Sequence, residues 1–307
     1  MFVDELEKRF PNYDLPKAFG QHVNAEISSQ ITVANELLDC FMMLTPVTQT
    51  QASKSEEHLT QDEHILKIIA DLSEILPENF DVEDIKYRWR NDYDTALKVV
   101  LFQETSRYNV LLTKVRLSLE TVGKCIAGQV VISPAIEKIT NSLAENRVPA
   151  AFLTSYPSVK PLADWFRDLK DRIAFFRDWS YKGQPSVFNI SAFTYPTGFT
   201  TALFQKYARK FEFPIDSLFM DFQFPPEKAT HEKAKDGAYI TGLYLEGAKW
   251  SVEENCLIEP QTMKLHELMP VMHFKPAQKR KKEAGKANPN LFYQCPCYYY
   301  PTRKGNL

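Results

Sequence analysis

The sequence predicts an α+β protein in which a helical region, residues 25–212, is followed by an antiparallel β unit. Through the first region apolar residues recur every three or four positions, the period of a helix buried on one side. Beyond it, short alternating runs are separated by turn residues, which is typical of strands. The clearest strand lies between Asp236-Gly237 and Glu246-Gly247. Both its faces are apolar, so we expect protein on each side, and Gly242 indicates a bend or close backbone contact of the kind found in small barrels.

The helical pattern predicts segments whose apolar stripes run from Ile27 to Phe41, Ile65 to Leu76, Leu97 to Val122, Ile136 to Leu143, Leu162 to Phe176, and Phe199 to Tyr207. The third is the longest, about seven turns, and we expect it to be the spine of the helical part. It begins after Asp92 or Asp94, either a suitable N-cap, and Gly123 and Gly128 mark its end. Ser133-Pro134 has the cap-then-proline order of a helix start.

The helix after Pro161 has an aromatic stripe on one side and charges on the other. Arg167 is four residues before Asp171, and Asp168 is four before Arg172. Such pairs stabilise a helix by only a few tenths of a kcal/mol each, so we expect a solvated face.

Further along, Leu218 begins an alternating strand, and Trp250–Val252 and Cys256–Ile258 form a hairpin around Glu253-Glu254-Asn255. Two polar stretches, residues 49–57 and 279–286, are expected to be loops.

The composition of the 307 residues, 44% hydrophobic and 25% charged, is that of a soluble globular protein. A net charge of −2 gives no general attraction to nucleic acid or to an anionic membrane, so we expect neither as a partner. No apolar run reaches the length of a membrane span. Five cysteines, mostly within apolar patterns, suit free thiols in the cytosol or an organelle continuous with it.

Several motifs, in their order and spacing, resemble the C-terminal region of dynein heavy chains, the axonemal branch more than the cytoplasmic. They are Asp236-Gly237, Gly242-Leu-Tyr-Leu-Glu246-Gly247-Ala248-Lys-Trp250, Met269-Pro270 and Tyr293-Gln-Cys295-Pro296. The sequence departs from the family at Asn189, where tryptophan is usual, and at Ala192, where glycine is usual, so packing before the last helix is expected to differ.

The resemblance implies three parts. Residues 1–24 look like the connector from the sixth AAA module, residues 25–212 like the helical part of the C-terminal domain, and residues 213–307 like its β-barrel part. The barrel is expected to be incomplete, because the family's strands continue past Leu307.

The resemblance also implies a non-catalytic structural or regulatory domain of an ATP-driven, minus-end-directed microtubule motor of the cilium or flagellum axoneme. ATP and Mg would bind modules upstream, and no cofactor, metal or catalytic residue is expected in this segment. Its partner would be the AAA ring of the same polypeptide, with microtubules and dynein intermediate and light chains bound through the parent complex. The aromatic stripe around Trp165, Phe166 and Phe176 is expected to fasten the domain to itself and across the ring.

The residues offer little for chemistry of their own. Neither Gly123-Lys124-Cys125 nor Gly285-Lys286-Ala287 has the glycine spacing or the Ser or Thr of a phosphate-binding loop. Asn189-Ile-Ser191 matches a glycosylation sequon, which we attribute to chance because no secretory signal precedes it. The basic run Lys279–Lys282 lacks interleaved aromatic residues, which favours a solvated loop over a surface for RNA or tubulin.

Two other classes of function stay open at this stage. One is an enzyme built on cysteine and histidine. Cys295 and Cys297 could hold zinc with His266 and His273, although their spacing is too short for common structural zinc sites, and Cys125 or Cys256 could meet a histidine in space. The other is an interaction or adaptor domain unrelated to motors.

Overall fold

The structure, a computed structural model, describes residues 30, 31, 33–35, 37, 38, 61–90, 95–158, 160–226, 230–261 and 266–278. They divide into two compact units. The large unit holds residues 61–242 and 271–278, and the small unit holds residues 243–261 and 266–270 with the helical residues between 30 and 38. Each unit is described by itself.

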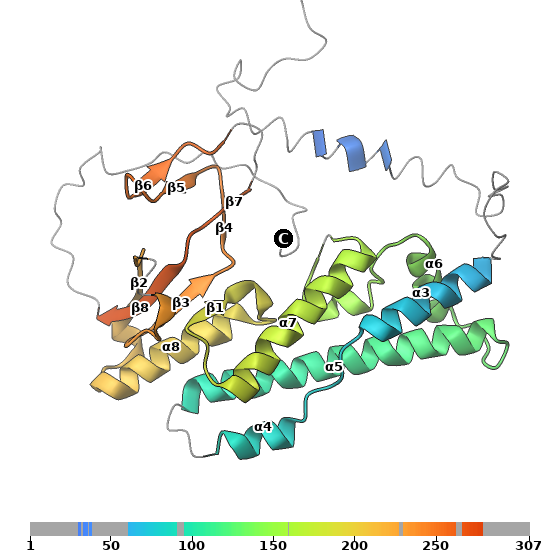
Figure 1. Cartoon of the computed structure of the whole chain (residues 1–307), viewed down its shortest axis with the longest axis horizontal. Helices are drawn as coiled ribbons and strands as arrows, with labels where there is room; N and C mark the ends of the chain where they lie inside the picture. The colour runs from blue at the N-terminus through green and yellow to red at the C-terminus, as the bar shows by residue number, and fades with distance from the viewer. Residues whose placement is uncertain are drawn as a thin grey trace, which may run out of the picture. The chain divides into compact units, whose positions relative to one another are not determined.

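The large unit contains a layer of helices and one sheet (Figure 1). Its described α-helices are α3 (Gln61–Ile75), α4 (Val82–Arg88), α5 (Thr95–Ile126), α6 (Pro134–Ala144), α7 (Leu162–Lys182) and α8 (Pro196–Phe211). Short 3-10 turns lie at η2 (Phe152–Thr154), η3 (Ile190–Ala192) and η4 (Ile215–Ser217). No described helix is both long enough and apolar enough to cross a membrane.

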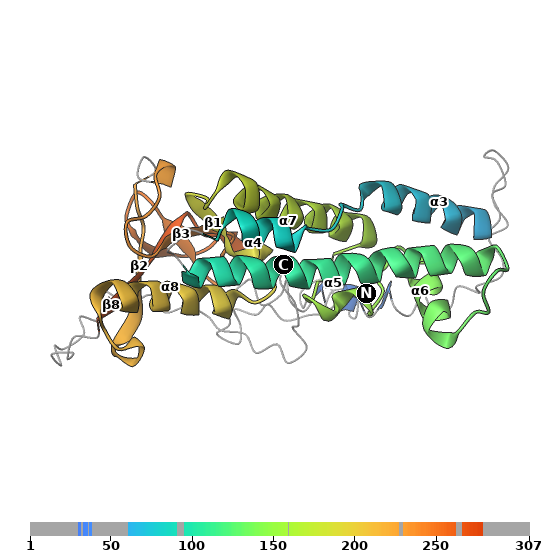
Figure 2. The same cartoon turned by 90° about the horizontal axis from the view of Figure 1, so that it is seen from below.

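Helix α5 is the spine that the sequence predicts, and it packs against α3, α4, α6, α7 and α8 (Figure 2). Every residue of its expected stripe is buried: Leu97, Leu101, Tyr108, Leu111, Val115, Leu119 and Val122. The helix ends at Ile126, between Gly123, which lies inside its last turn, and Gly128, which has φ of 72°, so the end expected at these glycines is confirmed. An isolated glycine is tolerated there because the surrounding stripe is buried on both sides of it.

The helices expected around residues 65–76, 136–143, 162–176 and 199–207 are present, with one addition. Of the helix expected from Ile27 to Phe41, the described residues between 30 and 38 are helical but exposed, and the rest lies outside the described residues. Ser133 caps α6, its hydroxyl accepting a hydrogen bond from the Ile136 amide at 3.4 Å, and the stripe of α3 ends before Pro77 as expected. Helix α4 was not expected, since seven residues give too short a window for a periodic pattern. Asp81 caps it, accepting from two backbone amides, and Ile85 is its buried anchor.

The sheet of the large unit has the strand order β1-β3-β8-β2. Its strands are β1 (Val187–Asn189), β2 (Leu218–Gln223), β3 (Ala238–Thr241) and β8 (Met272–Gln278). β8 pairs antiparallel with β2 and β3, but β1 pairs parallel with β3. The expectation of an entirely antiparallel sheet is therefore wrong at this edge, because β1 comes from within the helical region and is joined to the sheet through α8.

The long strand expected around Gly242 is two strands. β3 ends at Thr241, Gly242 has φ of 84°, and β4 (Tyr244–Glu246) belongs to the small unit. A Cβ at Gly242 would collide with the side-chain oxygen of Asn189. The expected bend and close contact at this glycine are thus confirmed. The bend is sharp enough to end the strand.

In the small unit β4 pairs antiparallel with β7 (His266–Leu268), and β5 (Lys249–Ser251) pairs with β6 (Cys256–Ile258) in the expected hairpin. The α+β class is confirmed. The described strands form open sheets, so the barrel stays a prediction. The connector 1–24, the loops 49–57 and 279–286 and the residues from 287 onward lie outside the described residues.

Candidate functional site: a buried polar junction

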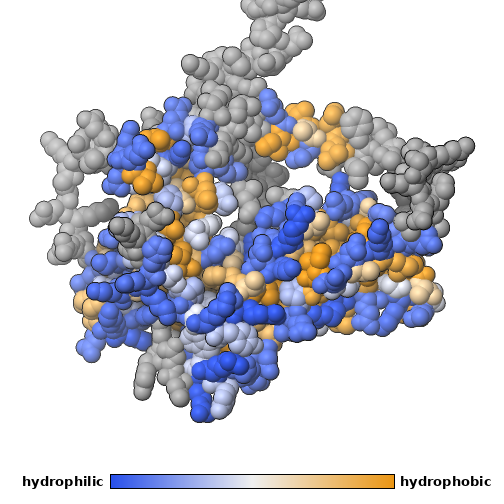
Figure 3. Space-filling view, viewed as in Figure 1, coloured by the Kyte–Doolittle hydropathy of each residue, from blue (hydrophilic) through white to orange (hydrophobic). Residues whose placement is uncertain are grey.

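The buried side of α7 forms an aromatic core of the large unit. Trp165, Phe166 and Phe176 are at most 1% exposed, and Trp179 is 2% exposed. Their rings contact those of Tyr108, Phe152, Tyr156, Phe188 and Phe193. Hydrophilic residues cover much of the molecular face in Figure 3. The stripe therefore fastens α7 to its own domain, and the expectation that it also reaches across the ring is wrong, because these rings have no free surface.

Inside this apolar region lies a group of polar contacts, which we call the polar junction. It consists of Glu104, Arg107 and Tyr108 on α5, Asp168 and Arg172 on α7, and the connection of residues 191–195 before α8. Polar groups are buried at a cost unless they are hydrogen-bonded, so the partners of each one determine what the junction does.

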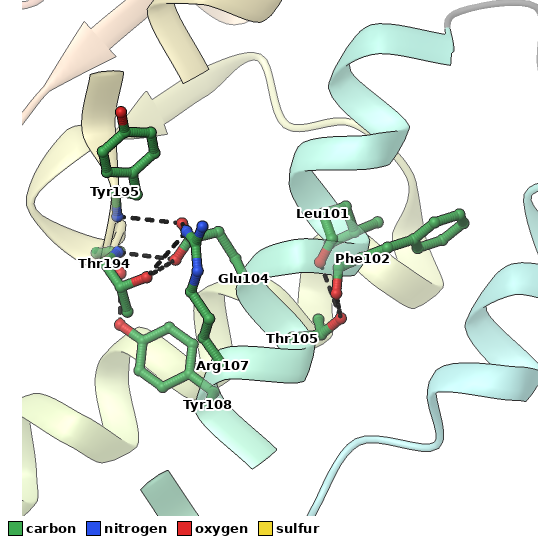
Figure 4. Close-up of polar contacts among 9 residues, drawn as sticks. Leu101, Phe102, Glu104, Thr105, Arg107, Tyr108, Thr194 and Tyr195 are labelled. Atoms are coloured by element: carbon green, nitrogen blue, oxygen red, sulfur yellow. Dashed lines mark hydrogen bonds and ion pairs between the residues drawn. The ribbon is translucent and has the colours of Figure 1, made fainter. Parts of the chain in front are cut away.

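Glu104 is the centre of the junction, and its carboxylate is 1% exposed (Figure 4). It accepts hydrogen bonds from the Thr194 amide and hydroxyl, both at 2.7 Å, and from the Tyr195 amide at 3.1 Å. Arg107, one turn along α5, donates to it at 2.9 Å. Tyr195 is the N-cap of α8 and its own side chain makes no capping bond, so a carboxylate from another helix satisfies amides at this helix start.

Two further ties reach the same connection. Tyr108 is fully buried and its hydroxyl donates to the Ala192 carbonyl at 2.5 Å. Arg172 donates to Asp168 at 2.6 Å and also to the Ser191 carbonyl, and its guanidinium lies 4.3 Å from the centre of the Tyr156 ring. Arg172 is 5% exposed, so the solvated face expected for the Asp168–Arg172 pair is wrong.

The remaining charges on that helix do stay near solvent. Arg167, expected to pair with Asp171, instead pairs with Asp164 one turn earlier, at 2.9 Å. The side chain of Arg167 is 73% exposed, as a solvated face requires.

Burial raises the pKa of the Tyr108 hydroxyl and that of the Tyr156 hydroxyl, and in both cases this effect exceeds the opposite effect of the nearby Arg172 charge, which lowers the pKa. Both phenols are therefore held neutral. The Tyr108 hydroxyl donates to the Ala192 carbonyl, so it is a structural tie and has little use as a base at neutral pH.

Asn189 and Ala192, where the sequence departs from the family pattern, both lie in this region. The Asn189 side chain accepts from the Ser191 amide at 3.2 Å and from the Ser191 hydroxyl at 2.7 Å, capping η3. Ala192 is fully buried. The sequon asparagine is thus occupied in a local cap.

The candidate ligands for cysteine and histidine chemistry lie in different units or outside the described residues, so the zinc alternative is not tested. His266 is on β7 in the small unit, and His273 is on β8 in the large unit with its Nε2 2.7 Å from the Asp236 carbonyl oxygen. Cys295 and Cys297 lie outside the described residues. Within the described ranges no three His, Cys, Asp or Glu side chains are grouped so that they could hold a metal ion.

The two described cysteines differ in surroundings. Cys125 is buried on α5, as expected of a small core residue, whereas Cys256 is exposed on β6. Desolvation and the Glu254 carboxylate, 3.6 Å from its sulfur, raise the pKa of the Cys256 thiol, which disfavours the nucleophilic thiolate.

The first phosphate-loop candidate is also accounted for. Gly123, Lys124 and Cys125 form the last turns of α5, and Lys124 pairs with Glu120 at 2.7 Å. The amides of a helical backbone point along the helix axis, whereas a phosphate-binding loop needs several amides that point to one common centre. The second candidate, Gly285-Lys286-Ala287, lies outside the described residues.

Comparison with known proteins identifies the family. A model of the C-terminal domain of dynein heavy chains matches residues 31–307, nearly the whole sequence. The protein belongs to this family. The resemblance inferred from the motifs around Gly242 is thereby confirmed.

Relatives within the family are axonemal. The protein is 41% identical over 308 residues to dynein axonemal heavy chain 2 of Homo sapiens, covering 96% of its own length and 7% of that protein. It is 42% identical over 297 residues to the dynein-1-beta heavy chain of the flagellar inner arm I1 complex of Chlamydomonas reinhardtii, covering 96% and 6%. It is 34% identical over 304 residues to human dynein axonemal heavy chain 12, covering 99% and 10%. The 307 residues thus span a tenth or less of the length of these relatives.

Proposed function

We propose that the protein is a non-catalytic structural domain of an axonemal dynein heavy chain, which braces the ring of AAA modules in the same polypeptide. The observation that carries the proposal is the match to axonemal heavy chains over 96% of the sequence. The polar junction supports it, since its buried carboxylate and arginine are engaged in ties between α5, α7 and the start of α8. Groups used in this way stiffen a domain and are not available to a substrate.

The parent protein is then a microtubule motor of the cilium or flagellum axoneme, driven by ATP and Mg bound in modules that precede this domain. Residues 1–24 connect the domain to the sixth module, residues 25–212 form its helical part and residues 213–307 its β part. Microtubules and the dynein intermediate and light chains are contacted through other parts of the complex. The family match and the axonemal identity of the relatives support this context.

The test is made in the full heavy chain. A motor that lacks this domain is compared with the intact motor for microtubule-stimulated ATPase rate, gliding velocity and thermal midpoint. Bracing predicts that velocity per ATP hydrolysed or the thermal midpoint falls, because relative motion of ring modules is no longer coupled through a rigid element. Unchanged ATPase, velocity and stability would refute the bracing role.

The non-catalytic part of the proposal has its own test. The 307-residue protein is incubated with ATP and Mg and, separately, assayed for bound zinc and for fast-reacting thiols. We expect no turnover and no stoichiometric metal. Hydrolysis by this protein, or about one zinc per molecule, would place chemistry in this segment.

A further inference from the structure

Two pairs of strands, one in each unit, continue one another in register. In the large unit Ile240 of β3 pairs with Met272 of β8, and in the small unit Tyr244 of β4 pairs with Leu268 of β7. Between these two pairs the first side of the ladder advances by four residues and the second goes back by four, so no residue is inserted or lost. The strands β3 and β4 on one side, and β7 and β8 on the other, therefore form one interrupted β-hairpin.

Gly242 and Pro270 are opposite each other in this register, and we call the two residues the joint. Both lie in the gap between the described strands. Gly242 has φ of 84°, and a proline ring holds φ at about −65°, whereas antiparallel strands have φ of about −140°. Both sides of the hairpin therefore leave strand geometry at the same level. Hydrogen bonding resumes beyond the joint, where the Met269 amide donates to the Leu243 carbonyl at 2.9 Å.

The boundary between the two compact units falls at the joint on both sides of the hairpin. The large unit stops at Gly242 and resumes at Val271, and the small unit includes the residues from Leu243 to Pro270. Hinge residues are a few positions at the ends of elements that absorb the change in φ and ψ between two packed bodies. The unit boundary follows from packing and the joint from backbone geometry, so two independent observations coincide at these residues.

The two residues of the joint contribute differently. Gly242 adopts its left-handed φ without the steric cost that a side chain would bring. Its backbone is held on the side of the large unit, because a Cβ there would collide with the Asn189 side-chain oxygen and lie 3.3 Å from the Ser191 hydroxyl. Pro270 has no N–H, so no third strand can clamp the joint by accepting a hydrogen bond from its nitrogen.

We infer that Gly242 and Pro270 form a hinge on which the small unit moves relative to the large unit. The hydrogen bond from Met269 to Leu243 holds the two chains of the moving side together, so they turn as one. Gly242 and Met269-Pro270 also belong to motifs through which the sequence resembles dynein C-terminal regions, and the hinge gives both motifs one physical role.

The hinge divides the domain into a rigid part and a mobile part. The large unit, with its polar junction and aromatic core, is the rigid part of the proposed brace, and the small unit is an arm attached to it. The inference does not rest on the bracing function, because the movement can be measured in the 307-residue protein without a motor. Loss of the hinge would leave bracing intact, and loss of bracing would leave the hinge intact.

The length of the hairpin beyond the joint determines how large the movement is. Gly247 follows β4 and is five residues from Gly242, which is about 17 Å at about 3.4 Å per residue. A rotation of about 20° would move that point by about 6 Å, whereas ordinary thermal displacement inside a packed unit is about 1 Å. Distances between labels on the two units can resolve a difference of this size.

The test measures distances between two spin labels by pulsed electron resonance in the 307-residue protein. Ketone-bearing unnatural residues carry the labels, so the native cysteines stay in place. One label replaces Val252 of the small unit, which is 74% exposed, and the other replaces Val131 of the large unit, which is 89% exposed. The control pair is Val131 with Tyr87, which is 65% exposed and also in the large unit. The two pairs share Val131, so local movement at that site affects both.

A hinge predicts that the distance distribution for Val252 and Val131 is at least about twice as wide as that of the control pair. Equal widths would overturn the inference.

Variants separate the joint from local movement of the label at Val252. Pro270→Gly adds backbone freedom at the joint and should widen the distribution, whereas Pro214→Gly, in a connection within the large unit, is the matched control and should leave it unchanged. A stiffened variant combines Gly242→Val and Pro270→Val, which favour strand geometry, with Asn189→Ala, which removes the collision, and it should narrow the distribution to the control width. An unchanged width in Pro270→Gly would overturn the hinge, and this variant decides the question alone if the stiffened variant does not fold.

Discussion

Replacing Glu104 tests the polar junction most directly. Glu104→Ala removes the acceptor of two backbone amides, one hydroxyl and the Arg107 guanidinium. Each buried donor left without a partner costs about 1–3 kcal/mol, and breaking a buried ionic contact by removing one partner costs about 3–5 kcal/mol in total. Solvent can reach Arg107, whose side chain is 43% exposed, so the loss of its ion pair contributes little to the fall in stability. We expect the free energy of unfolding to fall by about 3–4 kcal/mol, most of it from the Thr194 and Tyr195 amides.

The assay is urea unfolding of the 307-residue protein followed by circular dichroism. Glu104→Gln keeps the shape and one acceptor oxygen, so it should lose about half as much as Glu104→Ala. Glu120→Ala is the control on the same helix, because Glu120 is exposed and pairs only with Lys124 at the surface, and its midpoint should not move measurably. If Glu104→Ala unfolds at the same urea concentration as Glu120→Ala, the carboxylate does not hold the start of α8.

Three further predictions concern the same unit. Gly242→Ala should destabilise the protein by about 1–3 kcal/mol, because Gly242 has a positive φ and a Cβ there would collide with Asn189. Gly123→Ala, in a helix with open space around the new Cβ, should stabilise the protein by about 0.5–1 kcal/mol. Thermal unfolding should therefore show a lower midpoint for the first variant and a higher midpoint for the second. Arg172→Met should cost about 1–3 kcal/mol, because it leaves the Ser191 carbonyl without this donor and the Asp168 carboxylate with Lys160 as its partner. Equal stability in urea would contradict the tie. Because burial raises the folded-state pKa of Tyr108, its stabilising effect is complete below the ordinary tyrosine pKa of about 10 and is lost as the pH rises above it. Tyr108→Phe should therefore be less stable at pH 7 and lose less stability between pH 9 and 12, and parallel pH profiles of the two proteins would refute this.

The helical half of the fold could be predicted from the sequence because burial on one side of a helix requires a periodic pattern of apolar residues. The stripe of α5 from Leu97 to Val122 and the stripe of α7 from Leu162 to Phe176 are both buried as expected. Where an element is too short for a period, the prediction fails. α4 has seven residues and β1 has three, and β1 enters the sheet parallel to β3 through a pairing that no local pattern indicates.

The polar junction was missed although one signal for it was present. Glu104 falls between Leu101 and Tyr108 on the stripe of α5, three residues from the first and four from the second, so a carboxylate stands on the face that is otherwise apolar. A charge in that position must find donors inside the protein. The pattern could have indicated Glu104 as a buried acceptor, but its donors at Thr194 and Tyr195 are about 90 residues away, and no periodicity connects them.

The aromatic core and the polar junction contribute different things to the same packing. Contacts such as Phe176 with Phe193 stabilise the unit without strong direction, so a shift of α7 by one helical turn, about 5.4 Å, would retain much of the buried area. The ties from Glu104, Tyr108 and Arg172 all end on residues 191–195, and hydrogen bonds at 2.5–3.1 Å do not survive such a shift. We therefore infer that the apolar stripes make the unit stable and the three ties fix the one arrangement of α5, α7 and α8. Replacing all three with apolar residues should then leave a helical, compact protein whose aromatic near-ultraviolet dichroism weakens, whereas an unchanged signal would assign the register to the aromatic rings alone.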